Sequence, residues 1–290
     1  MTIIKFLLPL IIIITGCTKH DIVIRNGIIY DGSGKNGYKA DLAIDDDKIT
    51  HISPNIKEKG LAELDASGLA IAPGFINMLS WATVSLIQDG RSLSDIKQGV
   101  TLEVFGEGSS MGPLNKTMKK NRQQYADSYS IEWTTLGEYL NFLEKKGVST
   151  NVASFIGATT LRIHEIGYED RPPTIKELQN MKKLVKQGME EGAMGIGSSL
   201  IYAPAFYSST EELIELCKIA SKYGGMYISH LRSESNNFLE ALDELITIAK
   251  KAEISAEVYH LKAGGLQNHY KMDLAIKKIN EARSDGLDIT

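Results

Sequence analysis

Short apolar runs alternate with longer amphipathic segments through most of the chain after Pro73 and Gly74. The runs have the length of buried strands, and the segments between them have the spacing of helices that bury one face. The expected strands lie at 75–79, 101–105, 151–156, 194–198, 226–229 and 256–261, and 288–290 would begin another. Repeated strand–helix units of this kind favour a parallel sheet.

Two of the expected helices carry start signals. Thr174 precedes Glu177, and Ser209 precedes Glu212, each at the spacing of a capping box, in which hydroxyl and carboxylate satisfy free backbone N–H groups reciprocally. Six strand–helix units and the start of a seventh favour an α/β fold of the (β/α)8 barrel type, incomplete at its C-terminus. Catalytic groups of such barrels sit at the carboxyl ends of the strands.

Residues 21–72 have a different pattern, with short strand-like runs separated by turn residues. The Asn26-Gly27 pair predicts a hairpin turn between two short strands. Further strands are expected at 40–44, 48–52 and 69–71. The chain is therefore expected to hold a small β domain at 17–72, a partial sandwich, followed by the barrel at 73–290.

The N-terminal segment resembles a bacterial lipoprotein signal. Lys5 precedes an apolar run at 6–14, which is too short to span a bilayer, and the run leads into Ile14-Thr15-Gly16-Cys17. We expect residues 1–16 to be a signal peptide, cleaved before a lipidated Cys17, and the protein to be exported and lipid-anchored to the cell envelope membrane. The alternative is a buried strand with a chance cysteine.

Composition narrows the choice of function class. Apolar residues make up 43% of the chain and charged residues 23%, which excludes wholesale disorder. The formal charge of −4 without a basic patch argues against a nucleic-acid partner. Cys217 is the only cysteine besides Cys17, so a lipidated Cys17 leaves no internal disulfide.

Candidate chemistry lies at the ends of two neighbouring strands. His230 and Arg232 end one strand region, and His260 and Lys262 end the next, with the alternation that turns both members of a pair the same way. Two imidazoles at the mouth of a barrel suit a metal ion. The alternative is a pair of unrelated histidines. Glu107, between two glycines after the strand at 101–105, is either an oxygen ligand or a solvated loop carboxylate.

Taken together, these motifs resemble the N-acyl-D-amino-acid deacylases (D-aminoacylases) of the amidohydrolase superfamily. The matching stretches are DIVIRNG (21–27), APGFI (72–76), GVT (99–101), NVA (151–153), the run 195–213 with Tyr202-Ala203-Pro204, HLRSE (230–234) and HLK (260–262). The resemblance implies a metal-dependent hydrolase barrel beside a small β-sandwich. It also implies hydrolysis of the linear amide of N-acyl-D-amino acids, a non-peptide C–N bond.

The resemblance assigns roles to single residues. It implies that His230 and His260 are zinc ligands and that Tyr202 and Lys262 lie near the substrate carboxylate. Either Arg232 or Lys262 would hold that carboxylate. A structural ion pair is the alternative for Arg232, and packing at the pocket rim is the alternative for Tyr202.

The sequence departs from the family pattern in the first barrel strand and after the second. The family's His-x-His is absent from the stretch 76–81, and the family's bridging cysteine aligns with Gly108. Glu107 is the expected substitute ligand. These departures indicate one zinc ion instead of two.

The family's general-base Asp follows the eighth strand and is therefore expected beyond residue 290. We expect the 290-residue chain to be a fragment, catalytically silent by itself, of a longer amidohydrolase. The expected partners are a small N-acyl amino acid and, through the lipid anchor alone, a membrane. Two other functions stay open at this point: a non-catalytic surface lipoprotein on the same barrel, and an amidohydrolase acting on cyclic amides.

Overall fold

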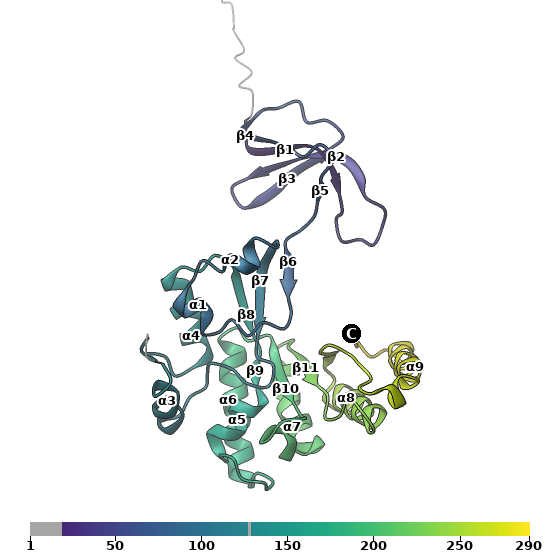
Figure 1. Ribbon diagram of the computed structural model, residues 1–290. Helices are drawn as coiled ribbons and strands as arrows, with labels where there is room; N and C mark the ends of the chain where they lie inside the picture. Colours follow the sequence, from purple (N-terminus) through teal and green to yellow (C-terminus); the bar gives the residue numbers. More distant parts are fainter. Residues whose placement is uncertain (1–18, 127–128) are drawn as a thin grey trace, which may run out of the picture. The chain divides into compact units, whose positions relative to one another are not determined.

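The computed structural model describes residues 19–126 and 129–290, which divide into two compact units (Figure 1). The first unit ends at Gly74, and the second runs from Phe75 to Thr290. The expected signal peptide and Cys17 lie outside the described residues. Within the described ranges, every helix is too short or too polar to cross a membrane.

The first unit is a small mixed β-sheet. Its strands are β1 (His20–Ile29), β2 (Tyr38–Asp45), β3 (Lys48–Ser53), β4 (Gly60–Asp65) and β5 (Ala70–Ile71). The order across the sheet is β3-β2-β1-β4, with β5 also paired to β1. Strand β1 runs antiparallel to β2 and parallel to β4 and β5. Apolar side chains of β1 and β2, together with Ile56, supply its small core.

The predicted hairpin at Asn26-Gly27 is wrong, because β1 continues through these residues as one strand. Both halves of β1 pair with β2, and the register shifts between Ile24 and Gly27. Asn26 takes a left-handed φ of 64° and donates its backbone N–H to Asp41 Oδ1 at 2.9 Å. An Asn-Gly pair suits a β-bulge as well as a turn, since both need positive φ.

The second unit is built on parallel strands whose order in space follows their order in the sequence. One group is β6 (Phe75–Asn77), β7 (Val100–Phe105) and β8 (Asn151–Ser154). The other is β9 (Ile156–Gly157), β10 (Gly195–Ser199), β11 (Met226–His230) and β12 (Ser255–Val258). Phe155 alone separates β8 from β9, and its N–H donates to Phe105 O at 2.8 Å. Ile289 then forms a parallel bridge with Ala256, so the last residues begin a further strand beside β12.

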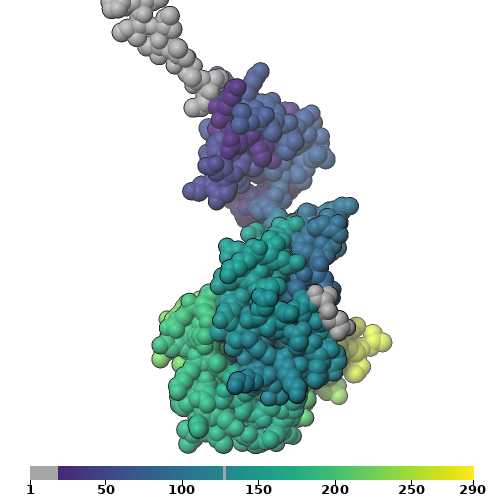
Figure 2. Space-filling model, turned by 90° about the vertical axis from the view of Figure 1, so that its left-hand side faces the viewer, coloured from purple at the N-terminus to yellow at the C-terminus, as the bar shows by residue number. Residues whose placement is uncertain are grey.

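Helices connect the successive strands. Their bounds are α1 (Ser85–Gln88), α2 (Leu93–Ile96), α3 (Lys116–Gln123), α4 (Leu136–Lys146), α5 (Ala158–Glu165), α6 (Ile175–Glu190), α7 (Thr210–Ser221), α8 (Phe238–Ala252) and α9 (Lys271–Ser284), with 3-10 turns η1 (Ala205–Tyr207) and η2 (Leu266–Asn268). Helices α5 to α9 each pack against the next. Figure 2 views this unit from the side of its teal and green helices, whose side chains form a continuous outer surface.

The predicted capping boxes differ in outcome. The box at Thr174 is confirmed, because its hydroxyl accepts from the Glu177 N–H and the Glu177 carboxylate returns to the Thr174 N–H. Ser209 caps α7 by accepting from the Glu212 N–H at 3.1 Å. The Glu212 carboxylate, however, turns inward to Arg162. A buried cation therefore takes the carboxylate that a reciprocal cap would have used.

The strands bury side chains on both faces, as a barrel requires. On one face Val104, Phe155, Ile228 and Tyr259 form a small inner cluster. On the other face a large cluster fills the space between strands and helices. Strand ends that lie side by side in such a sheet bring residues distant in sequence to one edge, and the candidate chemistry is found there.

Candidate metal centre

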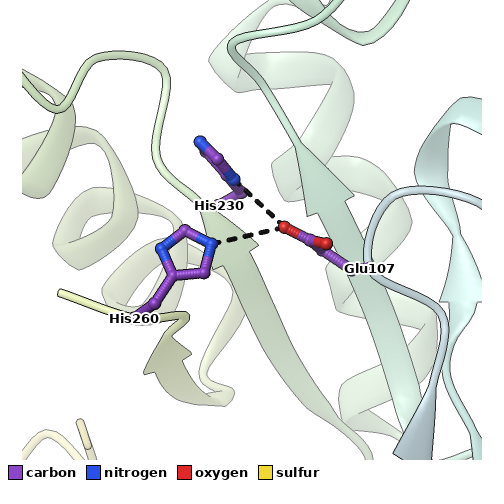
Figure 3. Close-up of side chains that lie close together, drawn as sticks. All are labelled: Glu107, His230 and His260. Atoms are coloured by element: carbon purple, nitrogen blue, oxygen red, sulfur yellow. Dashed lines mark hydrogen bonds and ion pairs between the residues drawn. The ribbon is translucent and has the colours of Figure 1, made fainter. Parts of the chain in front are cut away.

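Glu107, His230 and His260 meet at the carboxyl ends of β7, β11 and β12 (Figure 3). Glu107 Oε1 lies 3.0 Å from His230 Nδ1 and 3.4 Å from His260 Nε2. The two imidazole rings stand edge to face, with their centroids 4.5 Å apart. The structure thus brings together the three residues for which the sequence predicts metal binding.

The two glycines beside Glu107 explain how its side chain reaches this point. Gly106 and Gly108 have φ values of 106° and 72°. A Cβ at Gly106 would lie 2.5 Å from Phe155 O, and one at Gly108 would lie 2.5 Å from Ser199 Oγ. Only glycine fits at either position, so the chain turns sharply against the neighbouring strands and directs Glu107 across the strand ends.

His260 reaches the site from a turn and not from a strand. The predicted strand 256–261 is too long, because β12 ends at Val258 and His260 has a left-handed φ of 35°. Tyr259 still donates its N–H to Ser229 O at 3.0 Å, which holds the start of this turn on β11. Burial first, and then the Glu107 charge, raise the pKa of the Tyr259 phenol, which therefore stays neutral beneath the site.

The donor set fits a zinc ion. Two imidazole nitrogens and one carboxylate oxygen are the ligands of many catalytic zinc sites. Two ligand atoms at zinc–ligand distances of 2.0–2.1 Å and a tetrahedral angle are about 3.3 Å apart. The distances from Glu107 to His230 and His260, 3.0 and 3.4 Å, match that edge. All three ligand atoms lie within 4.8 Å of one another, so a small closure would complete the geometry.

Trp81 supports the carboxylate and lines a cavity. It follows β6, where the family pattern places a histidine pair, and its Nε1 donates to Glu107 Oε2 at 3.0 Å. A cavity of about 310 Å³ opens beside the indole. Its lining residues are Trp81, Thr83, Val84, Ser109, Ser110, Met111, Arg122, Tyr125 and Tyr129. Trp81 therefore contacts the Glu107 carboxylate and also lines this cavity.

Tyr202 and Lys262, predicted to bind substrate, both lie beside the imidazoles. The exposed Tyr202 ring has its centroid 5.3 Å from that of His230. Lys262 Nζ contacts Glu234 Oε1 and lies 2.8 Å from His260 Nδ1. The Tyr202 ring and the Lys262 ammonium therefore both lie next to the candidate ligands, and the ammonium is paired with Glu234.

Arg232 is engaged elsewhere, which favours the structural ion pair over the predicted binding of a carboxylate. Its Nε and Nη2 donate to the two oxygens of Glu244, both at 2.8 Å. Nη1 donates to Phe206 O at 2.7 Å, and Nη2 donates to Ser208 O at 2.9 Å. Burial opposes the charge of the guanidinium, but Glu244 outweighs it and raises the pKa of Arg232. Arg232 therefore ties the η1 segment to α8.

Arg232→Gln is accordingly expected to lower the free energy of unfolding by about 2 kcal/mol, the typical value of hydrogen bonds to a charged group. The KM for a carboxylate substrate should stay within about twofold, because no free donor pair is lost. Urea unfolding and steady-state kinetics on the full-length protein measure both quantities. A large rise in KM at unchanged stability would instead show that Arg232 binds the substrate.

Sequence reasoning missed two residues of the site, Glu234 and Trp81. Glu234 has no predicted role at the metal site, although it follows His230 by four residues. Its Oε1 lies 3.1 Å from His260 Nδ1 and 3.4 Å from His230 Nε2. The only sequence signal for Trp81 is its position just after the first barrel strand.

Comparisons with known proteins show that the chain is similar to deacylases of N-acyl-D-amino acids. No protein-family model matches the chain. A D-aminoacylase of Alcaligenes xylosoxydans xylosoxydans is 32% identical over 252 residues, 86% of this chain and 52% of the relative. An N-acyl-D-aspartate deacylase of the same organism is 27% identical over 90% of this chain and 53% of the relative. The chain thus spans about half the length of these curated relatives.

Solved structures agree with the sequence relatives. The N-acyl-D-glutamate deacylase of Bordetella bronchiseptica, in complex with zinc and a phosphonate inhibitor, superposes with a TM-score of 0.86 at 26% identity, over 94% of this chain and 58% of that structure. A D-aminoacylase solved in a study of its binuclear metal centre gives a TM-score of 0.85 at 26% identity, over 93% and 57%. The likeness covers both units of the chain.

Proposed function

We propose that the whole protein is a zinc-dependent enzyme that deacylates N-acyl-D-amino acids, because the chain is similar to D-aminoacylases and N-acyl-D-amino-acid deacylases, which are amidohydrolases. The observation that carries this proposal is the meeting of Glu107, His230 and His260 at the strand ends. Zinc bound there would supply Lewis acidity, polarising the amide carbonyl and making water acidic enough to react near neutral pH.

The other residues at the site have roles that follow from their chemistry. Lys262 offers an exposed ammonium, paired with Glu234, that would attract the substrate carboxylate as a point charge. Tyr202 offers a hydroxyl donor on the open side of His230. Trp81 holds the carboxylate of Glu107 through its indole N–H. The general base is proposed to be an aspartate beyond residue 290, as the family resemblance implies.

We further propose that the protein holds one zinc ion. The stretch 76–81 reads Ile-Asn-Met-Leu-Ser-Trp and so lacks the histidine pair that would hold a second ion. One ion is compatible with activity, because in the related D-aminoacylase with a binuclear centre one metal activates and the second attenuates. Metal analysis after dialysis should give one equivalent per chain; two retained equivalents would contradict this proposal.

The activity test uses the full-length protein, a panel of N-acetyl-D-amino acids and their L-enantiomers, with release of free amine as the readout. We expect hydrolysis of D-substrates only, its loss after treatment with a chelator, and its return when zinc is added. A folded, zinc-loaded protein that turns over no substrate would instead support a non-catalytic lipoprotein. Turnover of cyclic amides alone would support the other alternative.

Cys17 is proposed to carry the lipid that anchors the protein to the cell envelope membrane. The proposal rests on the short apolar run and the small residues before the cysteine. Mass spectrometry of the mature N-terminus should show an acylated Cys17, and Cys17→Ser should release the protein from membranes. An intact N-terminus that begins at Met1 would contradict it.

A further inference from the structure

A second carboxylate, that of Glu234, contacts the ring nitrogens that Glu107 leaves free. Glu107 Oε1 faces His230 Nδ1 and His260 Nε2. Glu234 Oε1 faces the opposite nitrogens, His230 Nε2 at 3.4 Å and His260 Nδ1 at 3.1 Å. Each imidazole therefore lies between two carboxylates: Glu107 faces one of its nitrogens, and Glu234 faces the other.

This arrangement matches what a histidine ligand needs behind it. A neutral imidazole that binds a metal through one nitrogen carries its proton on the other, and that N–H needs an acceptor. If both rings bind on the Glu107 side, both protons point to Glu234. His230 Nε2 is buried and has no hydrogen-bond partner among the described residues, and the nearest ionic partner that it has there is Glu234.

Lys262 competes for one of these nitrogens. Its Nζ contacts Glu234 Oε1 and also lies 2.8 Å from His260 Nδ1. An ammonium has only donors, so a hydrogen bond to Nδ1 requires that nitrogen to be unprotonated. The proton would then sit on Nε2, the nitrogen that faces Glu107 and the proposed metal. Contact of Lys262 with His260 and metal binding by His260 therefore exclude each other.

We propose that Glu234 is a positioning residue of the zinc site: it accepts the outer N–H of His230 and His260, and it competes with His260 Nδ1 for the ammonium of Lys262, which contacts both. The proposal rests on the proposed zinc binding, because it concerns how these rings present their nitrogens to the ion. Glu234 selects the ring tautomer that exposes the metal-facing lone pair. Lys262, held on the same carboxylate, stays near the mouth of the site for substrate.

The first test is the zinc affinity of Glu234→Gln in the full-length protein, measured by competition with a chelating dye. Glutamine keeps the shape of glutamate but loses the charge that retains Lys262 and orders the imidazole protons. The affinity should fall by roughly ten- to a hundredfold, as for other residues that orient metal ligands. Glu240→Gln, an exposed charge change on α8, is the matched control and should leave the affinity unchanged.

The second test separates positioning from general support of the fold. Lys262→Met alone should leave zinc affinity unchanged or raise it. Added to Glu234→Gln, it should recover much of the lost affinity, because the competing ammonium is gone. Nitrogen NMR shifts of the two rings should show more Nε2–H tautomer of His260 in Glu234→Gln than in the wild type. A merely structural role would produce neither the recovery nor the change of tautomer.

The outcomes also separate this inference from the proposed function. Tight zinc binding by the wild type, together with unchanged affinity in a folded Glu234→Gln, would overturn the role of Glu234 and leave the enzyme proposal intact. Absence of zinc binding by the folded wild type would overturn both. If Glu234→Gln does not fold, Lys262→Met provides the test by itself. A loss of zinc affinity in Lys262→Met as large as that expected for Glu234→Gln would show that Lys262 does not compete for His260. That result would refute the proposal.

Discussion

His230→Ala is expected to abolish tight zinc binding by the full-length protein and, with it, the proposed hydrolysis of N-acyl-D-amino acids. Zinc binding to a protein site contributes about 10–16 kcal/mol over four ligands, so one ligand accounts for about 3 kcal/mol, a hundredfold or more in affinity. Without the ion, several kcal/mol of transition-state stabilisation disappear, and kcat/KM should fall on the order of a thousandfold. Chelator competition and amine release measure the two effects.

The control for this experiment is His51→Ala, because His51 is an exposed imidazole on β3 in the first unit. It should change neither zinc content nor rate. Circular dichroism should show that His230→Ala keeps its fold, since the ring lies at the edge of the strands and not in the large helix-facing cluster. Full retention of zinc in a folded His230→Ala would remove His230 from the ligand set and refute the site.

Arg162→Met is expected to lower the free energy of unfolding by about 3–5 kcal/mol, because it leaves a buried carboxylate without its cation. Arg162 on α5 is fully buried, and its Nη1 donates to Glu212 Oε2 on α7 at 2.8 Å. Its Nη2 also donates to the carbonyl oxygens of Glu169 and Arg171. The pair thus joins two barrel helices and the loop after α5. Urea unfolding at neutral pH measures the loss.

The double variant Arg162→Met with Glu212→Leu should recover most of this stability. Removing both charges removes the buried unpaired ion, and apolar residues of similar volume often replace such pairs without loss. Arg91→Ala, which breaks the exposed pair with Asp89, is the surface control and should leave the free energy of unfolding almost unchanged, because water screens this pair. Equal stability losses in the single and double variants would show that shape, not charge pairing, makes Arg162 important.

Hydrophobic periodicity alone determined much of the second unit. Each apolar run became part of a parallel strand, because a run of that length flanked by amphipathic segments buries itself most readily between helices. Capping at Thr174 was equally local, since hydroxyl and carboxylate are three residues apart. His230 and His260 could be paired from sequence because neighbouring parallel strands end at the same edge.

The tertiary structure decided how polar side chains share their partners. Glu212 has the spacing of a capping-box residue, yet its carboxylate accepts a hydrogen bond from the buried Arg162 instead. Arg232 had the position of a substrate ligand, yet Glu244 on α8 already occupies it. Asn26-Gly27 is a sequence typical of a hairpin turn, yet β1 pairs with β2 on both sides of it, so the pair forms a bulge within one strand.

The candidate site shows the same division. Sequence alone pointed to Glu107, His230 and His260, because ligand chemistry and strand order are both readable along the chain. It did not place Glu234 behind the imidazoles or Trp81 on the carboxylate. Burial makes every charge and N–H seek the nearest partner in space, and that choice depends on loop and helix positions that no local pattern encodes.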